Sequence, residues 1–254
     1  MQSATAILSG NLPAEPNSFI GRERDLAELA RLLAEVRALT LSGPGGIGKT
    51  RLAVRLARDV ITRDMIARDV IARDVIARDV IADDVIPGAG HSAAGNSGNG
   101  HSDAGYSGSG SGGLDEAWLV ELADWHGQTA EQVAATIGIR EEQDVPLAQT
   151  LAEALRSRRM LLILDTCEHQ VSECATLVQL LLARCPWLRI IATSREPLRV
   201  RGETVWRVPP LDLPPDGAAA AELARHEAVR LFAARLHADQ GQHGVGGPAV
   251  PAAS

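Results

Sequence analysis

The sequence predicts an α/β fold with a mainly parallel sheet that is buried on both faces. Two apolar segments carry this prediction. Residues 38–42 (ALTLS) run directly into a glycine-rich loop, and residues 51–57 after the loop have the pattern of a helix. Residues 160–165 (MLLILD) are wholly apolar up to a final aspartate. Strands without polar alternation are typical of parallel sheets that are buried on both faces.

The glycine-rich loop fits the pattern G-x-x-x-x-G-K-[ST] at every constrained position, which predicts a P-loop NTPase. Its glycines let the backbone curl so that successive N–H groups point at one phosphate, to which the next helix also directs its positive end. Lys49, the only lysine of the chain, is expected to reach the β- and γ-phosphates, and the Thr50 hydroxyl to hold Mg²⁺. The alternative is a glycine-rich turn without a ligand. The predicted nucleotide-binding residues of the loop are Gly43, Pro44, Gly45, Gly46, Ile47, Gly48, Lys49, Thr50 and Arg51.

Composition narrows the class of protein. Of the 254 residues, 45% are hydrophobic and 22% charged, as in ordinary globular proteins. The net charge of −7 does not indicate a nucleic-acid-binding face. Cys167, Cys174 and Cys185 have no metal-ligand spacing, so we expect reduced thiols in a cytoplasmic protein. No signal peptide is evident at the N-terminus, and no apolar stretch is long enough to span a membrane.

The segment upstream of the phosphate loop predicts a helix and a contact with adenosine. Four apolar residues between positions 26 and 36 recur at helical spacing, with charged residues on the other side. Ile20, Gly21 and Arg22 stand just before this helix, and we expect them to border the adenine and ribose. The alternative is that an apolar residue staples the start of the helix while Arg22 and Glu23 lie in solvent.

Residues 58–86 repeat the pentapeptide Arg-Asp-Val-Ile-Ala with small variations. Each repeat turns the apolar pair by about 140° around a helix, so no single apolar face forms. Four aspartates nevertheless precede an arginine by four positions, namely Asp59, Asp64, Asp69 and Asp74, and such pairs favour a helix by about 0.2–0.5 kcal/mol each. We therefore expect a helix that continues from the phosphate loop and is exposed in its distal part. The repeat either carries no specific function or serves self-association.

Residues 87–113 are rich in Gly, Ser, Ala and Asn, which predicts a flexible linker. We accordingly divide the chain into two parts of one NTPase domain, 1–57 and 114–238, an inserted segment at 58–113, and a disordered tail at 239–254. The further strands are expected at 117–122, 160–165, 188–192 and 202–208. The further helices are expected at 129–137, along Leu147, Leu151 and Leu155, at 171–184 and at 222–238.

Two charged residues at strand ends are candidates for the chemistry. Asp165 ends its apolar strand and is expected to meet Mg²⁺ or the water shell of Mg²⁺. Arg195 follows the strand at 188–192, where it would lie beside the γ-phosphate and distinguish ATP from ADP. The alternative for Arg195 is a surface arginine that is paired with a carboxylate.

The whole set of motifs resembles the NB-ARC-type ATPase module of STAND signal-transduction ATPases, above all large actinobacterial regulators of the LuxR and AfsR kinds. The resemblance covers roughly residues 15–57 and 114–238. It rests on Phe-Ile-Gly-Arg-Glu, Gly-Pro-Gly-Gly-Ile-Gly-Lys-Thr, Trp-Leu-Val-Glu-Leu, Leu-Ile-Leu-Asp-Thr-Cys-Glu-His, Ala-Thr-Ser-Arg-Glu-Pro-Leu and Gly-Glu-Thr-Val-Trp-Arg-Val-Pro-Pro-Leu.

The resemblance implies a three-layer α/β/α P-loop NTPase domain that acts as a nucleotide switch, in which ADP holds a closed state and exchange for ATP permits assembly. It implies that Lys49 and Thr50 bind phosphate and Mg²⁺, that Asp165 has the second acidic role, and that Arg195 senses the γ-phosphate. Thr166, rather than a second acidic residue, follows Asp165, so we expect slow hydrolysis or none, with Glu168 as the remaining candidate catalytic carboxylate. The family's helical lid and DNA-binding domain would follow residue 238, so we expect a truncated member without a DNA-binding element.

Three functions stay open at this point. The first is the ATP/ADP-binding switch module of a transcriptional regulator. The second is an active P-loop ATPase or a small-molecule kinase, although a kinase needs an acceptor pocket and an arginine-rich lid that the sequence does not identify. The third is a degenerate fragment with weak nucleotide binding. The expected ligands are ATP or ADP with Mg²⁺, and the expected partners are other regulator domains or a second copy, with no membrane.

Overall fold

A six-stranded sheet organises the computed structural model, which describes residues 9–15, 18–82, 113–215, 217 and 219–242. Every neighbouring pair of strands in it is parallel, and the order is β1-β3-β4-β5-β2-β6. This confirms the predicted α/β fold with a parallel sheet. The strands are β1 (Ser9–Gly10), β2 (Ala38–Ser42), β3 (Glu116–Glu121), β4 (Met160–Asp165), β5 (Arg189–Ser194) and β6 (Glu203–Arg207).

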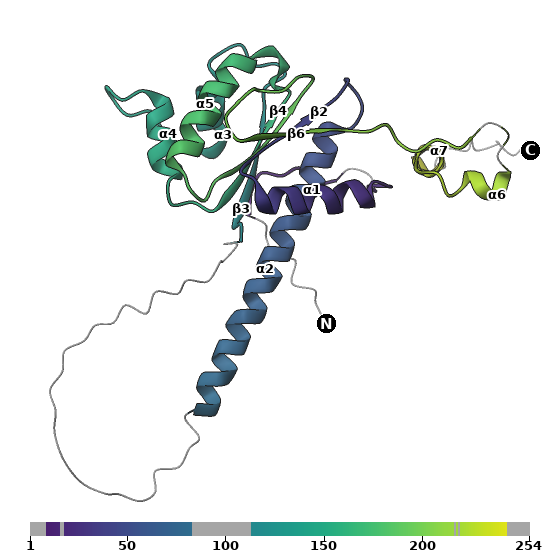
Figure 1. The fold of residues 1–254 in the computed structure, drawn as a ribbon, viewed down its shortest axis with the longest axis horizontal. Helices are drawn as coiled ribbons and strands as arrows, with labels where there is room; N and C mark the ends of the chain where they lie inside the picture. The colour runs from purple at the N-terminus through teal and green to yellow at the C-terminus, as the bar shows by residue number, and fades with distance from the viewer. Residues whose placement is uncertain (1–8, 16–17, 83–112, 216, 218, 243–254) are drawn as a thin grey trace, which may run out of the picture.

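Helices cover both faces of the sheet (Figure 1). Strand β4 shows why, because its side chains alternate between two apolar cores. Leu162 and Leu164 belong to the core under α3, α4 and α5, whereas Leu161 and Ile163 belong to the core under α1 and α2. The helices are α1 (Glu23–Glu35), α2 (Lys49–Ala82), α3 (Thr129–Ile137), α4 (Leu147–Leu155) and α5 (Val171–Arg184), with a 3₁₀ turn η1 (Cys167–His169) before α5.

The strand order brings three strand ends together. Strand β5 lies between β2 and β4, although it follows both in the sequence. Ser42 is in register with Ser194, and Glu121 with Asp165. In a parallel sheet all carboxyl ends lie at one edge, where ligands bind in open α/β sheets. The glycine-rich loop, Asp165 and Arg195 therefore leave the sheet at the same edge.

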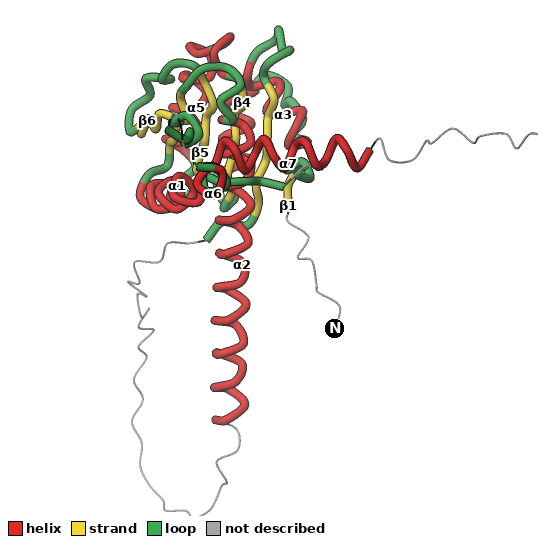
Figure 2. The backbone as a smooth tube through the Cα atoms, turned by 90° about the vertical axis from the view of Figure 1, so that its right-hand side faces the viewer, coloured by secondary structure: helices red, strands yellow, loops and turns green. Residues whose placement is uncertain are grey.

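Helix α2 is one continuous helix of 34 residues that runs from the phosphate loop through the repeat, as predicted. It extends well beyond the body of the molecule (Figures 1 and 2). Ile61 is fully buried, but the side chain of Ile66 is 60% exposed. Asp64 accepts the Leu114 N–H at 2.8 Å, and Arg68 pairs with Asp115. The first repeats are therefore fastened to the start of β3.

The C-terminal region corrects one prediction. In place of a single helix at 222–238, the chain forms a short helix α6 (Ala220–Leu223) and a longer helix α7 (Glu227–Gln242). The break has a physical cause, because Asp212 binds the chain there: its carboxylate lies 2.6 Å from His226 Nδ1, and its carbonyl accepts the Ala228 N–H at 3.2 Å. Residues 239–242 are helical, where a disordered tail was expected, and the rest of that tail lies outside the described residues.

Strand β1 was not predicted, and it pairs with β3 through two residues only. Most of the expected linker at 87–113 lies outside the described residues. Within the described ranges, no helix is both long and apolar enough to cross a membrane.

The three cysteines are buried and free. A thiol hydrogen bond with Cys174, together with burial, raises the pKa of Cys167 well above its usual value. Burial also raises the pKa of Cys185. Both groups are therefore neutral thiols at neutral pH.

Candidate functional site

The loop at 43–48 leaves β2 and enters α2, and its conformation depends on glycine. Gly46 and Gly48 have φ angles of 77° and 97°, in the left-handed region that other residues rarely adopt. A Cβ atom at either position would meet nothing within 4 Å, so these glycines serve the backbone conformation, and the space around them is open. Pro44, Gly45 and Gly46 are exposed. The backbone of the loop is therefore accessible to a ligand.

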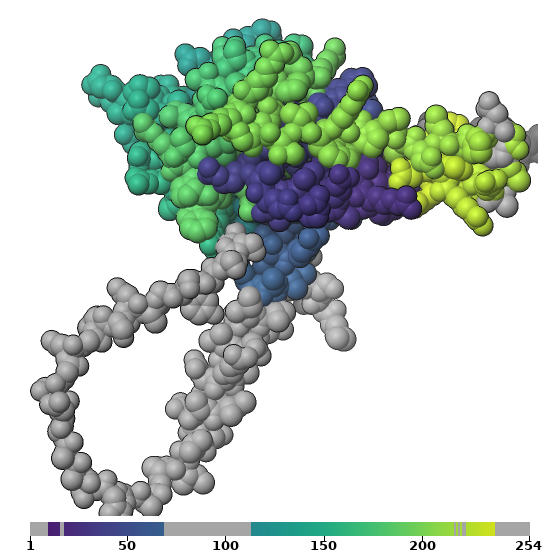
Figure 3. Space-filling view, in the orientation of Figure 1, coloured from purple at the N-terminus to yellow at the C-terminus, as the bar shows by residue number. Residues whose placement is uncertain are grey.

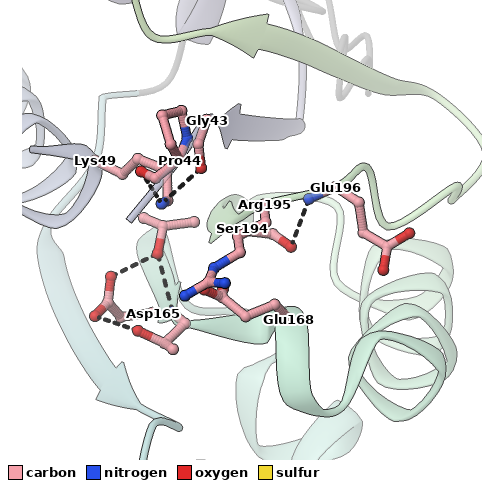
Figure 4. Close-up of polar contacts among 10 residues, drawn as sticks. Gly43, Pro44, Lys49, Asp165, Glu168, Ser194, Arg195 and Glu196 are labelled. Atoms are coloured by element: carbon pink, nitrogen blue, oxygen red, sulfur yellow. Dashed lines mark hydrogen bonds and ion pairs between the residues drawn. The ribbon is translucent and has the colours of Figure 1, made fainter. Parts of the chain in front are cut away.

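Lys49 begins α2 and is largely buried, with 8% of its surface exposed. Its ammonium donates hydrogen bonds to the carbonyl oxygens of Gly43 at 3.0 Å and Pro44 at 3.1 Å (Figure 4). The ammonium group is thus held inside its own loop, where its charge lies beside the exposed backbone. A phosphate bound to the loop would meet this charge and the N-terminus of α2 together.

Asp165 is the centre of a hydroxyl network that joins α2, β4 and β5. Its Oδ1 accepts hydrogen bonds from Thr50 and from Thr193, each at 2.6 Å. Its Oδ2 accepts a bond of 3.1 Å from Thr166, whose N–H donates in turn to the Thr193 hydroxyl at 2.9 Å. Two predicted metal-binding residues, Thr50 and Asp165, therefore lie in direct contact, and Thr193 is an unpredicted member of the site.

The chemistry of these donors fits Mg²⁺ bound together with a phosphate. One carboxylate and one hydroxyl leave most of an octahedral shell to water and phosphate oxygens, which is how Mg²⁺ is usually held in nucleotide sites. Among the described residues, no group of three or more His, Cys, Asp or Glu side chains is placed to hold a metal.

Arg195 and Glu168 form an ion pair next to the phosphate loop. Arg195 Nε lies 3.2 Å from Glu168 Oε1, and Figure 4 shows the arginine folded over the glutamate. A Cβ atom on Gly45 would lie 3.5 Å from Arg195 Nη2, so the guanidinium is also beside the loop. Arg195 is 66% exposed, whereas Glu168 is 13% exposed and its buried Oε2 has no partner among the described residues. The alternative of an exposed arginine paired with a carboxylate is therefore present in the structure, and the contact of Arg195 with a γ-phosphate stays a prediction.

Arg22 is buried and binds the phosphate loop itself. Its guanidinium donates to the Ile47 carbonyl at 3.0 Å and to the Pro209 carbonyl at 3.1 Å, and pairs with Asp25 at 2.8 Å. Gly21 is buried as well, and Ile20 is partly buried. The alternative in which Arg22 lies in solvent is therefore wrong, since the residue connects the start of α1 to the loop.

Phe19 and Arg51 line a small apolar pocket beside Thr50, with a volume of about 100 Å³. The guanidinium groups of Arg51 and Arg55 lie 5.8 Å and 5.6 Å from the centre of the Phe19 ring, within the range of cation–π contacts. Phe19 belongs to the Phe-Ile-Gly-Arg-Glu segment that suggested an adenosine pocket, although only Ile20, Gly21 and Arg22 were named as site residues. The remaining lining residues are Pro13, Ala14, Glu15 and Val54.

No protein-family model matches the chain. It is similar to two proteins of Mycobacterium tuberculosis. One, "Putative HTH-type transcriptional regulator Rv0890c", is 32% identical over 204 residues, which are 80% of this chain and 16% of that protein. The other, "Uncharacterized protein Rv0894", is 28% identical over 201 residues, which are 78% of this chain and 39% of that protein. The chain thus spans well under half the length of these relatives.

Among solved structures, the chain aligns with a STAND protein with a tetratricopeptide repeat sensor from Pyrococcus horikoshii. The TM-score is 0.40 and the sequence identity 17%, over 91% of this chain and 29% of that one.

Proposed function

We propose that this chain is a nucleotide-binding regulatory module that binds ATP or ADP with Mg²⁺ at the loop 43–50. The observation that carries the proposal is the arrangement of Lys49, Thr50 and Asp165. A buried ammonium group begins α2 behind an exposed glycine-rich backbone, and the next residue of the helix bonds an aspartate from a separate strand. This arrangement provides a charge and N–H groups for phosphate, and two oxygen ligands for Mg²⁺.

Residues around the loop support the same ligand. Arg195 lies beside Gly45 and would contact the outermost phosphate, so it would distinguish ATP from ADP. Phe19 and Arg51 border a pocket next to Thr50 that would take part of the adenosine, and Arg22 holds the loop from behind. When bound, Mg²⁺ would neutralise phosphate charge between Thr50 and Asp165.

Hydrolysis is expected to be slow. The residue after Asp165 is Thr166, whose hydroxyl bonds Asp165, so it cannot accept a proton from water as a carboxylate would. Glu168 is the nearest remaining carboxylate, and Arg195 occupies one of its oxygens. Because its other oxygen, Oε2, is buried, a water-activating role for Glu168 requires that this pair open.

We further propose that the module serves a transcriptional regulator of the STAND class with an NB-ARC-like ATPase. The support is the set of sequence motifs together with the similarity to a relative that is named as a helix-turn-helix regulator, of which this chain spans 16%. DNA binding and assembly would then belong to other domains or to a second copy. An active ATPase and a weakly binding fragment are the two competing functions.

Thermal unfolding with and without Mg²⁺-ADP and Mg²⁺-ATP tests the proposal. A ligand at a hundredfold excess over its Kd stabilises the folded state by about 2.7 kcal/mol, which is roughly 5–10 °C for a domain of this size. We expect this shift in the wild type and none in Lys49→Ala. Arg63→Ala, which removes an exposed cation from the same helix, is the matched control and should keep the shift. No shift in a wild type that unfolds cooperatively would refute nucleotide binding.

A further inference from the structure

A carboxylate from the C-terminal helix caps the start of α1. Glu227, the first residue of α7, accepts the N–H of Arg22 at 2.6 Å. Arg22 is the N-cap of α1, and its own side chain makes no capping hydrogen bond. The positive end of α1 is therefore met by a negative charge from a helix that lies more than two hundred positions later in the chain, which is a favourable arrangement.

The backbone at residues 21–22 leaves room for the Glu227 side chain. Gly21 has a φ angle of 78°, and a Cβ atom there would lie 2.9 Å from Cδ and 3.0 Å from Cβ and Cγ of Glu227. Any other residue at position 21 would displace the glutamate. Arg22 itself has a φ angle of 63°, a conformation that costs energy for a residue with a side chain. The backbone at 21–22 is thus fitted to Glu227.

The other end of Arg22 binds the phosphate loop. Its guanidinium holds the Ile47 carbonyl at 3.0 Å, which fixes the plane of the peptide between Ile47 and Gly48. Because the C=O and N–H of a trans peptide point in opposite directions, the Gly48 N–H is turned away from Arg22. The same guanidinium holds the Pro209 carbonyl, which lies on the segment that leads to α6 and α7. One buried side chain therefore joins the loop and the C-terminal segment.

Further contacts of α7 are weaker and lie at its rim. Arg230 is 3.8 Å from Glu23, with both side chains substantially exposed. Arg24, Pro210 and Arg225 help to line a hollow of about 750 Å³ between α1 and the C-terminal segment. In the space-filling view the two segments meet along a narrow front (Figure 3). The contact between Glu227 and Arg22 is thus the main polar connection by which α7 reaches the loop.

We propose that Glu227 is a positioning residue that couples the docking of α7 to the phosphate loop through Arg22. The coupling rests on the proposed function, since the loop is where the nucleotide would bind. With α7 docked, Arg22 is held and the Ile47–Gly48 peptide keeps one orientation, so the loop is organised for phosphate. By reciprocity, a nucleotide that favours this loop conformation also favours docked α7. Whatever follows α7 in a longer protein would then be placed according to the nucleotide.

The experiment measures Mg²⁺-ADP affinity and the hydrogen exchange of α7 in the same variants. We expect Glu227→Ala to weaken binding at least fivefold, the low end of measured couplings between two sites. Glu227→Gln keeps an acceptor for the Arg22 N–H and should fall between this variant and the wild type. Glu222→Gln removes a charge from an exposed residue of α6 and should bind like the wild type. Mg²⁺-ADP should slow amide exchange along α7 in the wild type but not in Glu227→Ala.

A purely structural role for Glu227 gives a different result. In that case Glu227→Ala would lower the free energy of unfolding in urea, but its affinity for Mg²⁺-ADP would equal that of the wild type. Mg²⁺-ADP would also still slow amide exchange along α7. This outcome would overturn the proposal. If the wild type binds no nucleotide, the exchange of amides 47–50 in the free protein decides instead. If amides 47–50 exchange faster in Glu227→Ala than in Glu222→Gln, the positioning role of Glu227 is upheld although the proposed function fails. If these amides exchange equally fast in the two variants, the positioning role and the proposed function are both refuted.

Discussion

The hydroxyl of Thr50 lies 2.6 Å from Oδ1 of Asp165, although the two residues are 115 positions apart. This hydrogen bond joins the first turn of α2 to the end of β4 across the intervening strand β5. Thr193, from the end of β5, donates to the same oxygen at 2.6 Å. Without these donors the carboxylate, which is 8% exposed, would lose most of its compensation for burial.

The first prediction follows from this contact. Thr50→Val keeps the shape of the side chain but removes the hydroxyl that would bind Mg²⁺. We expect the variant to bind ADP equally with Mg²⁺ and with EDTA, whereas the wild type gains affinity from Mg²⁺. Thr62→Val, at an exposed position of the same helix, is the control and should respond like the wild type. Isothermal titration in the two buffers measures the difference, and a full magnesium effect in Thr50→Val would contradict the assignment.

The second prediction concerns discrimination between ATP and ADP. Arg195→Met removes the guanidinium beside Gly45 and should weaken ATP binding about tenfold, or about 1.4 kcal/mol, while ADP binding changes little. Arg199→Met is the matched control, because Arg199 is an exposed arginine that pairs with Glu196 at 3.7 Å. Competition titrations give the ratio of the two affinities. If both nucleotides lose affinity equally, Arg195 does not read the γ-phosphate.

The third prediction concerns stability at acid pH. Glu116 accepts hydrogen bonds from Arg158 Nε at 2.6 Å and Arg158 Nη2 at 2.5 Å. Burial acts to raise the pKa of Glu116, but the hydrogen bonds from Arg158 and Trp118 outweigh it, and the pKa lies below its usual value of 4.5. A carboxyl with a lowered pKa stabilises the fold above the unfolded-state value, and this stability is lost as the pH falls through the folded-state pKa.

Glu116→Gln should therefore lower the free energy of unfolding by about 1–2 kcal/mol at pH 7 and flatten its decline below pH 4.5. Urea unfolding at a series of pH values measures both effects. Glu153→Gln is the control, since Glu153 is 65% exposed and its pair with Arg156 is 3.8 Å long. An acid decline in Glu116→Gln as steep as in the wild type would show that other carboxyls dominate.

The fourth prediction concerns residues 69–112, the larger part of the inserted segment. The described residues on its two sides lie together, because a Cβ atom on Gly113 would lie 2.8 Å from Arg68 Nη2 and 2.9 Å from Asp64 Cβ. Replacing residues 69–112 with a six-residue Gly-Ser linker should leave the nucleotide-induced shift unchanged. The shorter closed loop should raise the free energy of unfolding by roughly 1–2 kcal/mol. A variant that fails to unfold cooperatively would show that the segment contributes to the fold.

Local patterns predicted most elements, because each depends on a few neighbouring residues. Helix α5 lies at the predicted bounds, where the apolar stripe is regular, and β4 ends at Asp165 as expected. The break between α6 and α7 was missed because its cause is distant. His226 is bound by Asp212, and neither residue has a local pattern that ends a helix.

In the candidate site too, contacts between residues far apart in the sequence were missed. Lys49 and Thr50 could be singled out as candidates from the sequence alone, since the motif of the glycine-rich loop is contiguous. The contacts of Thr193 with Asp165 and of Glu227 with Arg22 were not predictable, because they depend on the strand order and on the return of the C-terminal segment. Arg195 and Glu168 were each singled out in the sequence, but their pairing was not, since it depends on how two strand ends meet.

The two halves of α2 differ in how firmly the rest of the protein holds them. A helix of 34 residues is about 51 Å long, and Asp64 and Arg68 fasten it to the start of β3 near its middle. Before this attachment, Leu52, Leu56 and Ile61 are fully buried, so a rotation of the helix there would have to displace packed core side chains. Lys49 and Thr50 therefore lie at the end of α2 that the core holds in place.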